Sequence, residues 1–393
     1  MDAVIQDAWA AWTKGDVLQA ETLAMQASET SAGRHLLFLC ALVKGEYERA
    51  LELHQSIEPS YARRAELDDP VVQAYLHLSR YSGAETFARA RGKDRTLCSF
   101  LAARAEDALA VTLEDMTEIP FADHPLSDYL PGFEAEVNGT QVVAHLDTGG
   151  TFLHMGPDRA KALGIDLGFR GEAAYHGGQT VQSYEGIART FSVGEALLEN
   201  VPVVALASLV EQWDFIIFGT NILEQFLSTI DYRSERLILS PRGDPELRKR
   251  HLALLGTQAI EVPFFLWGTH YMFARGRVGD RDDLNFFVDS GLVSLHPDGK
   301  GGVRQAAFWA AQADLEAWGL DPELVRKGVF ESPVTLSLGP LQQRGLLFLA
   351  QGRPPVTSLG GVRIDGLLSH AFLRNTTWTL DFEKHRYLFQ SRQ

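Results

Sequence analysis

Two short motifs, each beginning with an aspartate, are the first candidates for chemistry in this chain of 393 residues. An Asp-Thr-Gly motif at Asp147–Gly149 follows the mostly apolar run 142–146, and an Asp-Ser-Gly motif at Asp289–Gly291 follows the run 284–288. Carboxyl groups act as general acids and bases, and a pair of them can divide the two roles. These two loops are therefore where we expect acid–base catalysis, provided that the fold brings them together.

The two motifs belong to a longer internal repeat. Turn signals precede both copies, at Asn138–Gly139 and at Gly279–Asp280, as expected for strands that lead into each motif. Further along, the block Gly219–Asp231 recurs as the block Ser369–Asp381, with the same spacing from first to last residue. Matching blocks in the same order are hard to obtain by chance, so we infer a duplicated, mainly β region.

This duplicated region, residues 130–392, resembles the aspartic protease clan, which includes pepsin-like and retroviral enzymes. The resemblance implies an all-β, bilobal fold in which each lobe contributes one aspartate loop. Both lobes lie on one chain here, as in pepsin-like enzymes. By resemblance, Asp147 and Asp289 are the catalytic pair that activates water.

The neighbours of the two aspartates also have implied roles. Thr148 and Ser290 match family positions whose hydrogen bonds lock the two loops together. Gly149 and Gly291 match positions where backbone must approach the carboxyl groups closely. These four residues are predicted to support the pair without taking part in proton transfer.

The implied reaction is hydrolysis of a peptide bond in a polypeptide or peptide substrate. Two carboxyl groups about 3 Å apart cannot both ionise easily, so they share a proton. One carboxyl takes a proton from water while the other hydrogen-bonds the carbonyl, and no metal or cofactor is expected. The competing hypothesis is a peptide-binding adaptor that keeps the cleft without cutting.

A flap that closes over the substrate is predicted from the stretch after the first motif. Tyr175, His176, Gly177 and Gly178 stand at the tip of an expected hairpin. Tyr175 is similar to the flap tyrosine of pepsin-like enzymes, whereas the two glycines are closer to the retroviral pattern. The alternative is an ordinary surface hairpin.

Three departures from the family pattern carry expectations of their own. Gly150 and Leu292 replace the hydroxyl residues that usually follow the motifs, which favours activity nearer pH 5–7 than pH 2. Ser369 stands where the first copy has Gly219, which puts the backbone behind Asp289 in question. Residues 297–327 have no match in the first copy, and we expect a glycine-rich loop and a helix over 304–319.

The first 110 residues are predicted to be helical, because alanine and leucine are abundant and proline is rare. Two similar stretches, residues 11–20 and 41–50, each place a glycine between two helices, at Gly15 and Gly45. They resemble tetratricopeptide hairpins, and a third, degenerate unit is expected over 71–90. The unit would either bind a protein partner or pack against the rest of the chain.

The composition changes near residue 110, so the expected order is a helical tetratricopeptide-like domain followed by a bilobal aspartic protease fold. Several prolines over residues 119–131 indicate a linker. The predicted divisions are 1–110 for the helical domain, 111–131 for the linker, 132–242 for the first lobe, 243–260 for an inter-lobe connection and 261–393 for the second lobe.

Composition excludes several other classes of protein. There are 36 Lys and Arg residues against 51 Asp and Glu, a net charge of −15, which argues against binding to nucleic acid. No signal peptide or membrane-spanning run is visible, and we expect a cytoplasmic protein without membrane insertion. Cys40 and Cys98 are too few for a disulfide framework, and no His-Glu-x-x-His metal motif is present.

Overall fold

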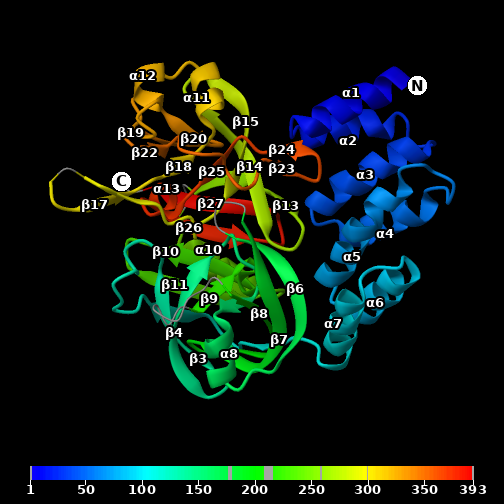
Figure 1. Ribbon diagram of the computed structural model, residues 1–393, viewed down its shortest axis with the longest axis horizontal. Coiled ribbons are helices and arrows are strands. Elements are labelled where there is room, and N and C mark those ends of the chain that lie inside the picture. The colour runs from blue at the N-terminus through cyan, green and yellow to red at the C-terminus, as the bar shows by residue number, and fades with distance from the viewer. Residues whose placement is uncertain (1, 176–178, 208–215, 257–258, 299, 392–393) are drawn as a thin grey trace. The chain divides into compact units, whose positions relative to one another are not determined.

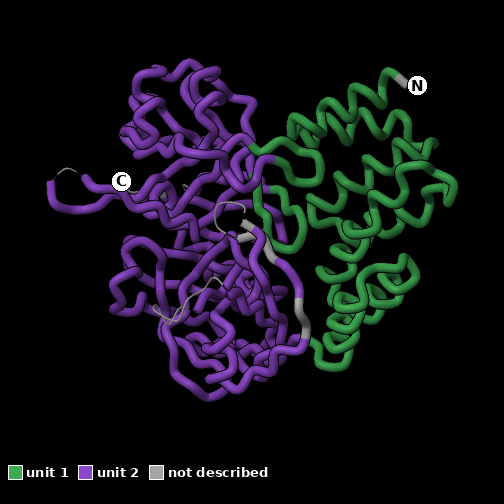
Figure 2. Tube along the Cα trace, in the orientation of Figure 1, with its two compact units in different colours: residues 1–108, 265–273, 358–364 green, residues 109–264, 274–357, 365–393 purple. Residues whose placement is uncertain are grey.

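The computed structural model describes residues 2–175, 179–207, 216–256, 259–298 and 300–391 (Figure 1). The chain divides into two compact units (Figure 2). Unit 1 comprises residues 1–108, 265–273 and 358–364, and unit 2 comprises residues 109–264, 274–357 and 365–393.

Unit 1 consists mainly of helices arranged as successive hairpins. Gly15 and Gly45 adopt φ values of 74° and 76°, in the left-handed region where glycine has no steric penalty. Ser79, with φ 55°, occupies the same kind of turn in a third hairpin. The helices are α1 (Asp2–Thr13), α2 (Val17–Met25), α3 (Ser31–Val43), α4 (Tyr47–Ser56), the 3₁₀ helix η1 (Arg64–Leu67), α5 (Asp68–His77), α6 (Tyr81–Ala90) and α7 (Arg95–Glu106).

Helical hairpins are therefore present where the sequence predicts them, including the third one. Small alanines, among them Ala20, Ala50 and Ala84, are fully buried and allow the paired helices to approach closely. A tetratricopeptide identity for these hairpins remains a prediction.

Unit 1 also contains two segments from much later in the sequence. One is the end of a hairpin formed by β13 (Phe265–Trp267) and β14 (Tyr271–Val278), and the other carries β23 (Ser358–Leu359) and β24 (Val362–Arg363). Trp12 Nε1 donates a hydrogen bond to the carbonyl of Gly360 at 2.8 Å, and His77 Nε2 donates to the carbonyl of Gly268 at 2.9 Å. These bonds make both segments part of the helical unit.

The first large sheet of unit 2 has eight strands. Their spatial order is β1 (Ala110–Thr112), β8 (Ala196–Leu206), β5 (Leu153–Met155), β9 (Ile216–Gly219), β4 (Thr140–Asp147), β3 (Gly132–Val137), β7 (Gln179–Val193) and β6 (Leu167–Tyr175). Helices α8 (Pro157–Ala162) and α9 (Thr220–Leu223) interrupt the strands along the chain.

The second large sheet of unit 2 repeats this plan. The order β8-β5-β9-β4-β3-β7 of the first sheet has its counterpart in β22-β18-β25-β15-β14-β20, and both contain a central parallel pair, β4–β9 or β15–β25. The internal repeat of the sequence is thus a repeat of topology. Besides β14, the elements are β15 (Arg281–Val288), β18 (Phe308–Trp309), α11 (Gln312–Ala317), α12 (Pro322–Val325), β19 (Val329–Glu331), β20 (Leu336–Leu338), β21 (Leu341–Gln343), β22 (Leu347–Leu349), β25 (Gly366–Leu368) and α13 (His370–Leu373).

A six-stranded sheet joins the two copies. Its central antiparallel pair takes one strand from each copy, and Oγ1 of Thr229 lies 2.6 Å from Oγ1 of Thr379. The buried ring of His251 bonds Thr229 through Nε2 and Ser240 through Nδ1, both at 2.6 Å. Burial lowers the pKa of His251 to about 4. The order is β12 (Ile260–Pro263), β27 (Arg386–Ser391), β26 (Thr376–Asp381), β10 (Phe226–Asp231), β11 (Arg236–Pro241) and β2 (Thr117–Pro120).

The ends of β10 and β26 show how closely the two copies agree. Asp231 pairs with Arg236 at 3.2 Å, and Asp381 pairs with Arg386 at 2.9 Å, each across the turn to the next strand. The aspartates that close the repeated sequence blocks are therefore structural, since each holds a β-hairpin in register.

Several segments differ from their sequence-based descriptions. Within the predicted linker 111–131, β2 pairs with β11, and the predicted connection 243–260 contains α10 (Pro245–Ala253). The expected helix over 304–319 is wrong for its first half, because β17 (Val303–Gln305) pairs with β16 (Leu295–Pro297) and β18 enters the second sheet. The alanine-rich sequence around Phe308 favours a helix locally, but pairing with β22 and β25 overrides that preference.

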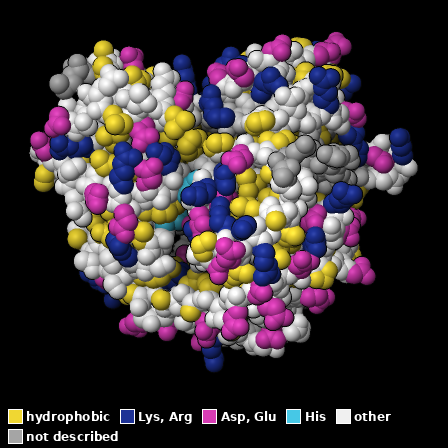
Figure 3. All heavy atoms as spheres, turned by 180° about the vertical axis from the view of Figure 1, so that it is seen from behind, with side chains coloured by type: hydrophobic (Ala, Val, Ile, Leu, Met, Phe, Trp, Pro, Cys, Tyr) yellow, Lys and Arg dark blue, Asp and Glu magenta, His cyan; other side chains and the backbone are white. Residues whose placement is uncertain are grey.

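On the face drawn in Figure 3, acidic, basic and apolar side chains are interspersed. Within the described residues, no helix is both long and apolar enough to cross a lipid bilayer. Cys40 and Cys98 are buried free thiols.

Candidate active site

The two candidate aspartates occupy equivalent places in the two large sheets. Asp147 is the last residue of β4 and pairs with Gly219 on the parallel strand β9. Asp289 directly follows β15, and its backbone N–H donates to the carbonyl of Leu368 on the parallel strand β25 at 2.9 Å. Each aspartate thus stands at the carboxyl end of a buried parallel pair, where the backbone must turn away.

Reciprocal hydrogen bonds bring the two loops together. The backbone N–H of Thr148 donates to Oγ of Ser290 at 2.9 Å, and the backbone N–H of Ser290 donates to Oγ1 of Thr148 at 3.0 Å. The Thr148 hydroxyl in turn donates to the carbonyl of Val288 at 3.1 Å. Thr148 and Ser290 both have 0% exposure, so these bonds are shielded from competing water.

The two carboxyl groups are each held by their own loop and packed against the other. The N–H of Gly149 donates to Oδ1 of Asp147 at 2.7 Å, and that of Gly291 donates to Oδ1 of Asp289 at 3.0 Å. A Cβ built on Gly149 would lie 2.5 Å from Asp289 Oδ1, and one on Gly291 would lie 2.0 Å from Asp147 Cγ. A side chain at either position would displace the opposite carboxyl group.

The electrostatics of the pair follow first from burial and then from this proximity. Burial raises the pKa of Asp289 well above its ordinary value, and the charge of Asp147 and a hydrogen bond with its side chain raise it further. The backbone N–H groups of Gly291 and Leu292 act in the opposite direction but are smaller influences. The arrangement favours one ionised and one protonated carboxyl, the state that acid–base catalysis uses.

The backbone behind each aspartate explains the difference between Gly219 and Ser369. A Cβ on Gly219 would lie 2.1 Å from the carbonyl oxygen of Thr151, so only glycine fits there. In the second copy, Ser369 Oγ donates to the carbonyl of Ala306 at 2.5 Å and accepts from the N–H of Ala371 at 3.1 Å. The serine is accommodated as the N-cap of α13, so it leaves the loop of Asp289 intact.

Two supporting residues were missed by the sequence analysis. The hydroxyl of Thr220 donates to the carbonyl of Thr148 at 2.9 Å from the buried start of α9. His154 Nε2 accepts from both the N–H and the hydroxyl of Thr151 at 2.9 Å, and burial lowers the pKa of His154 to about 4. Thr220 directly follows Gly219, the first residue of the repeated block, which is the signal that could have identified it, whereas nothing in the sequence marks His154.

His145, next to the first motif, faces away from the pair. Its Nδ1 lies 2.9 Å from the carbonyl oxygen of Leu130, and its ring packs on His124 with centroids 4.7 Å apart. Burial is the main reason that the pKa of His145 falls to about 4. This histidine is therefore a structural residue.

The predicted flap coincides with a long β-hairpin. Strands β6 and β7 pair antiparallel as far as Tyr175 opposite Gln179. His176, Gly177 and Gly178 lie outside the described residues, as does the side chain of Tyr175. Among the residues that the structure describes, no group of three or more His, Cys, Asp or Glu side chains has a geometry that could hold a metal ion.

Comparison with known proteins gives one family match, to the first copy of the repeat. A family model described as aspartyl protease matches residues 133–222, from the start of β3 into α9. No curated protein matches the chain. Residues 133–222 are thus similar to aspartyl proteases.

Two similar solved structures are both distant. A retropepsin-like aspartic protease from Rickettsia conorii is 18% identical with a TM-score of 0.25, covering 34% of this chain and 94% of that one. Basic 7S globulin from soybean is 10% identical with a TM-score of 0.45, covering 71% of this chain and 95% of that one.

Proposed function

We propose that this protein is an aspartic endopeptidase whose catalytic pair is Asp147 and Asp289. The observation that carries the proposal is the reciprocal bonding of Thr148 and Ser290, which holds two carboxyl groups from separate lobes against each other. A pair of partly buried aspartates held against each other has no evident structural purpose, because each would be more stable alone in water. Catalysis is the use that explains this cost.

The mechanism follows from the shared proton. A water molecule between the carboxyl groups gives a proton to the ionised aspartate while its oxygen attacks the carbonyl carbon of the peptide. The protonated aspartate donates a hydrogen bond and then its proton to the carbonyl oxygen, which forms a neutral gem-diol. Transfer of a proton to the amide nitrogen and cleavage of the C–N bond release an amine and a carboxylic acid, and the pair regains its single proton.

The remaining parts of the predicted site join this proposal. The hairpin of β6 and β7, with Tyr175, His176, Gly177 and Gly178 around its tip, would close over the substrate and exclude water. Activity nearer pH 5–7 than pH 2 is part of the proposal, because Gly150 and Leu292 offer no hydroxyl to stabilise an ionised carboxylate. Polypeptides or peptides are the proposed substrates.

The test is cleavage of an unstructured protein by the purified full chain between pH 3 and pH 8. Asp147→Asn and Asp289→Asn keep the size of the side chain but cannot share a proton, so we expect each to abolish cleavage. Asp314→Asn alters an exposed aspartate on α11 and should cleave like the wild type. Equal cleavage by all four proteins would refute the proposal, and binding of peptides without any cleavage would favour the adaptor.

A further inference from the structure

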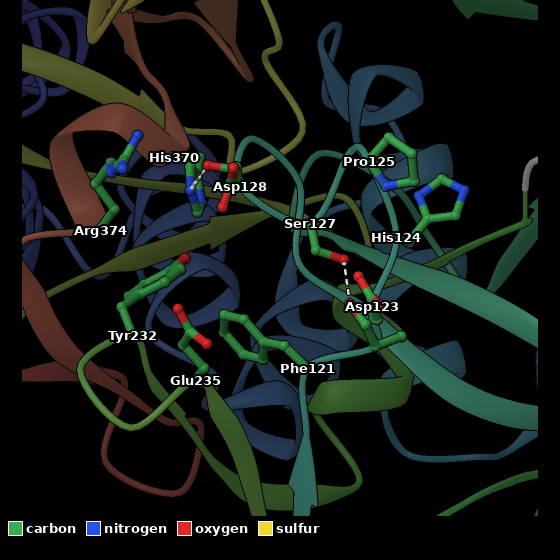
Figure 4. Close-up of a pocket in the computed structure, with 11 residues that line it drawn as sticks. Phe121, Asp123, His124, Pro125, Ser127, Asp128, Tyr232, Glu235, His370 and Arg374 are labelled. Carbon is green, nitrogen blue, oxygen red and sulfur yellow. Dashed lines mark hydrogen bonds between the residues drawn. The ribbon is translucent and has the colours of Figure 1, made fainter.

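A cavity in unit 2 shares no residue with the aspartate loops. It has a volume of about 540 Å³ and lies among residues 121–128, the turn between β10 and β11, and α13 (Figure 4). The segment 121–128 belongs to the predicted linker, so this cavity has no counterpart in the expectations from the sequence. Its lining includes Phe121, Asp123, Tyr232, Glu235, His370 and Arg374.

Two buried polar atoms line this cavity without a partner. His370 and Tyr232 have exposures of only 2% and 7%. Among the described residues, neither Nδ1 of His370 nor the hydroxyl of Tyr232 has a hydrogen-bond partner. Figure 4 shows the Tyr232 hydroxyl directed toward His370. Buried polar atoms are nearly always paired, so two such atoms in one cavity indicate a ligand that supplies the missing bonds.

The chemistry of His370 limits what that ligand can be. Its Nε2 lies 3.2 Å from the carbonyl oxygen of Asp128, which can only accept, so Nε2 carries the hydrogen. Burial and the nearby Arg374 lower the pKa of His370 to about 3, so the ring is neutral and Nδ1 offers a lone pair. A ligand that pairs with Nδ1 must therefore donate a hydrogen bond, which excludes a simple anion.

The charges and rings around the cavity favour a cation. Asp123, Asp128 and Glu235 line it with three exposed carboxyl groups, against the single guanidinium of Arg374. The ring of Phe121 lies 6.1 Å from that of Tyr232, edge to face, so aromatic surface adjoins the carboxyl groups. Aromatic faces beside carboxylates attract protonated amines through both charge and the ring quadrupole.

We propose that this cavity binds an alkylammonium group. The ammonium would donate one hydrogen bond to Nδ1 of His370 and one to the oxygen of Tyr232, while Glu235 and Asp123 balance its charge. The group has two possible sources, a small free amine or an amino group of a polypeptide, and the recognition chemistry is the same for both. The site is independent of peptide cleavage, so it stands even if the aspartate pair proves inactive.

The test is calorimetric titration of the full chain with 1,5-diaminopentane and with the peptide acetyl-Gly-Lys-Gly-amide, against 1,5-pentanediol and glutarate. We expect binding of an amine probe and none of the diol or the dianion. Binding of the diamine alone would assign the site to a free amine, and binding of the peptide alone to a polypeptide. Absence of binding by both amines, or equal binding of the diol, would overturn the proposal.

Matched variants locate the binding. Tyr232→Phe removes only the hydroxyl, and Glu235→Gln removes only the charge. Each should lower the affinity for the amine by about 3- to 10-fold, as expected for one hydrogen bond or charge contact. Glu323→Gln changes an exposed carboxylate on α12 outside the cavity and should leave binding unchanged. Binding that is unaltered in both cavity variants would show that the amine lies elsewhere and would refute the site.

Discussion

The hydroxyl of Thr148 offers the sharpest test of how the two lobes are held together. Replacement by valine keeps the shape of the side chain but removes the acceptor for Ser290 N–H, at 3.0 Å, and the donor to the carbonyl of Val288, at 3.1 Å. Both groups belong to a region from which Thr148 excludes water, with 0% exposure. Each unsatisfied buried group costs about 1–3 kcal/mol, so Thr148→Val should lower the free energy of unfolding by about 2–6 kcal/mol.

The same change should affect catalysis more strongly than its effect on stability suggests. Of the two reciprocal bonds, only the one from the N–H of residue 148 to Ser290 Oγ then joins the loops. Asp147 and Asp289 are held together less firmly, so they share a proton and position one water between them less well. Misplacement of a catalytic group by about 1 Å can cost about 100-fold in rate, and we expect a loss of kcat of that order. KM should change little, because the valine does not contact the substrate.

The assay combines urea unfolding with peptide cleavage in a double-mutant cycle. Ser290→Ala removes the acceptor for Thr148 N–H and should cost about 1–3 kcal/mol alone. Because the two hydroxyls serve one junction, the double variant should lose less than the sum, with a coupling energy of about 1 kcal/mol or more. Thr140→Val, at an exposed threonine of β4, is the control. A loss below about 0.5 kcal/mol for Thr148→Val, or strict additivity, would refute the reasoning.

Three further outcomes are expected. Gly291→Ala should abolish cleavage because its Cβ would lie 2.0 Å from Asp147 Cγ, whereas Gly168→Ala, with nothing within 4 Å of the added atom, should keep normal kcat/KM. Asp289→Asn should be more stable than the wild type at pH 7, and this advantage should shrink as the pH falls toward 4. The pKa of Asp289 is raised in the folded protein, so above the ordinary pKa of an aspartate only the unfolded wild type gains stability by ionising this group. Equal urea midpoints at pH 7 would contradict this. Wild type should lose stability as the pH falls from 6.5 to 4, since unfolded His251 gains a proton that the buried ring, with a pKa of about 4, does not accept. His251 contributes about 3 kcal/mol to this loss, and His251→Gln should flatten the dependence of the urea-derived free energy of unfolding on pH between 6.5 and 4. An unchanged slope in the variant would assign the acid sensitivity to other groups.

The sequence predicted the parts of the site that depend on local pattern and repetition. The two aspartate loops and the helical turns at Gly15 and Gly45 were recognisable, because a motif or a left-handed turn is encoded by adjacent residues. The repeat also anticipated the matching topology of the two sheets. The roles of Thr148 and Ser290 were implied by resemblance, and their hydrogen bonds now give those roles a geometry.

What the sequence did not predict depends on partners that are distant along the chain. The helix expected over 304–319 gave way to strand β18, whose neighbours β22 and β25 come from about 40 to 60 residues later. His154 acquired its role through a loop conformation that no spacing rule encodes. Ser369 fits because its hydroxyl donates to the carbonyl of Ala306, and only the folding of the second copy brings these two residues together.

The hydrogen bond from Trp12 to Gly360 bears on the order in which the protein is assembled during synthesis. The helices of residues 2–106 leave the ribosome before the segments 265–273 and 358–364 that belong with them, which follow about 160 and 250 residues later. Contacts of such long sequence separation form late, because a long loop must close before they are gained. The nascent helical region must therefore wait, with Trp12 lacking its acceptor, until Gly360 has been synthesised. For the same reason, a fragment that ends at residue 108 would lack part of its own unit and should be a poor independent domain.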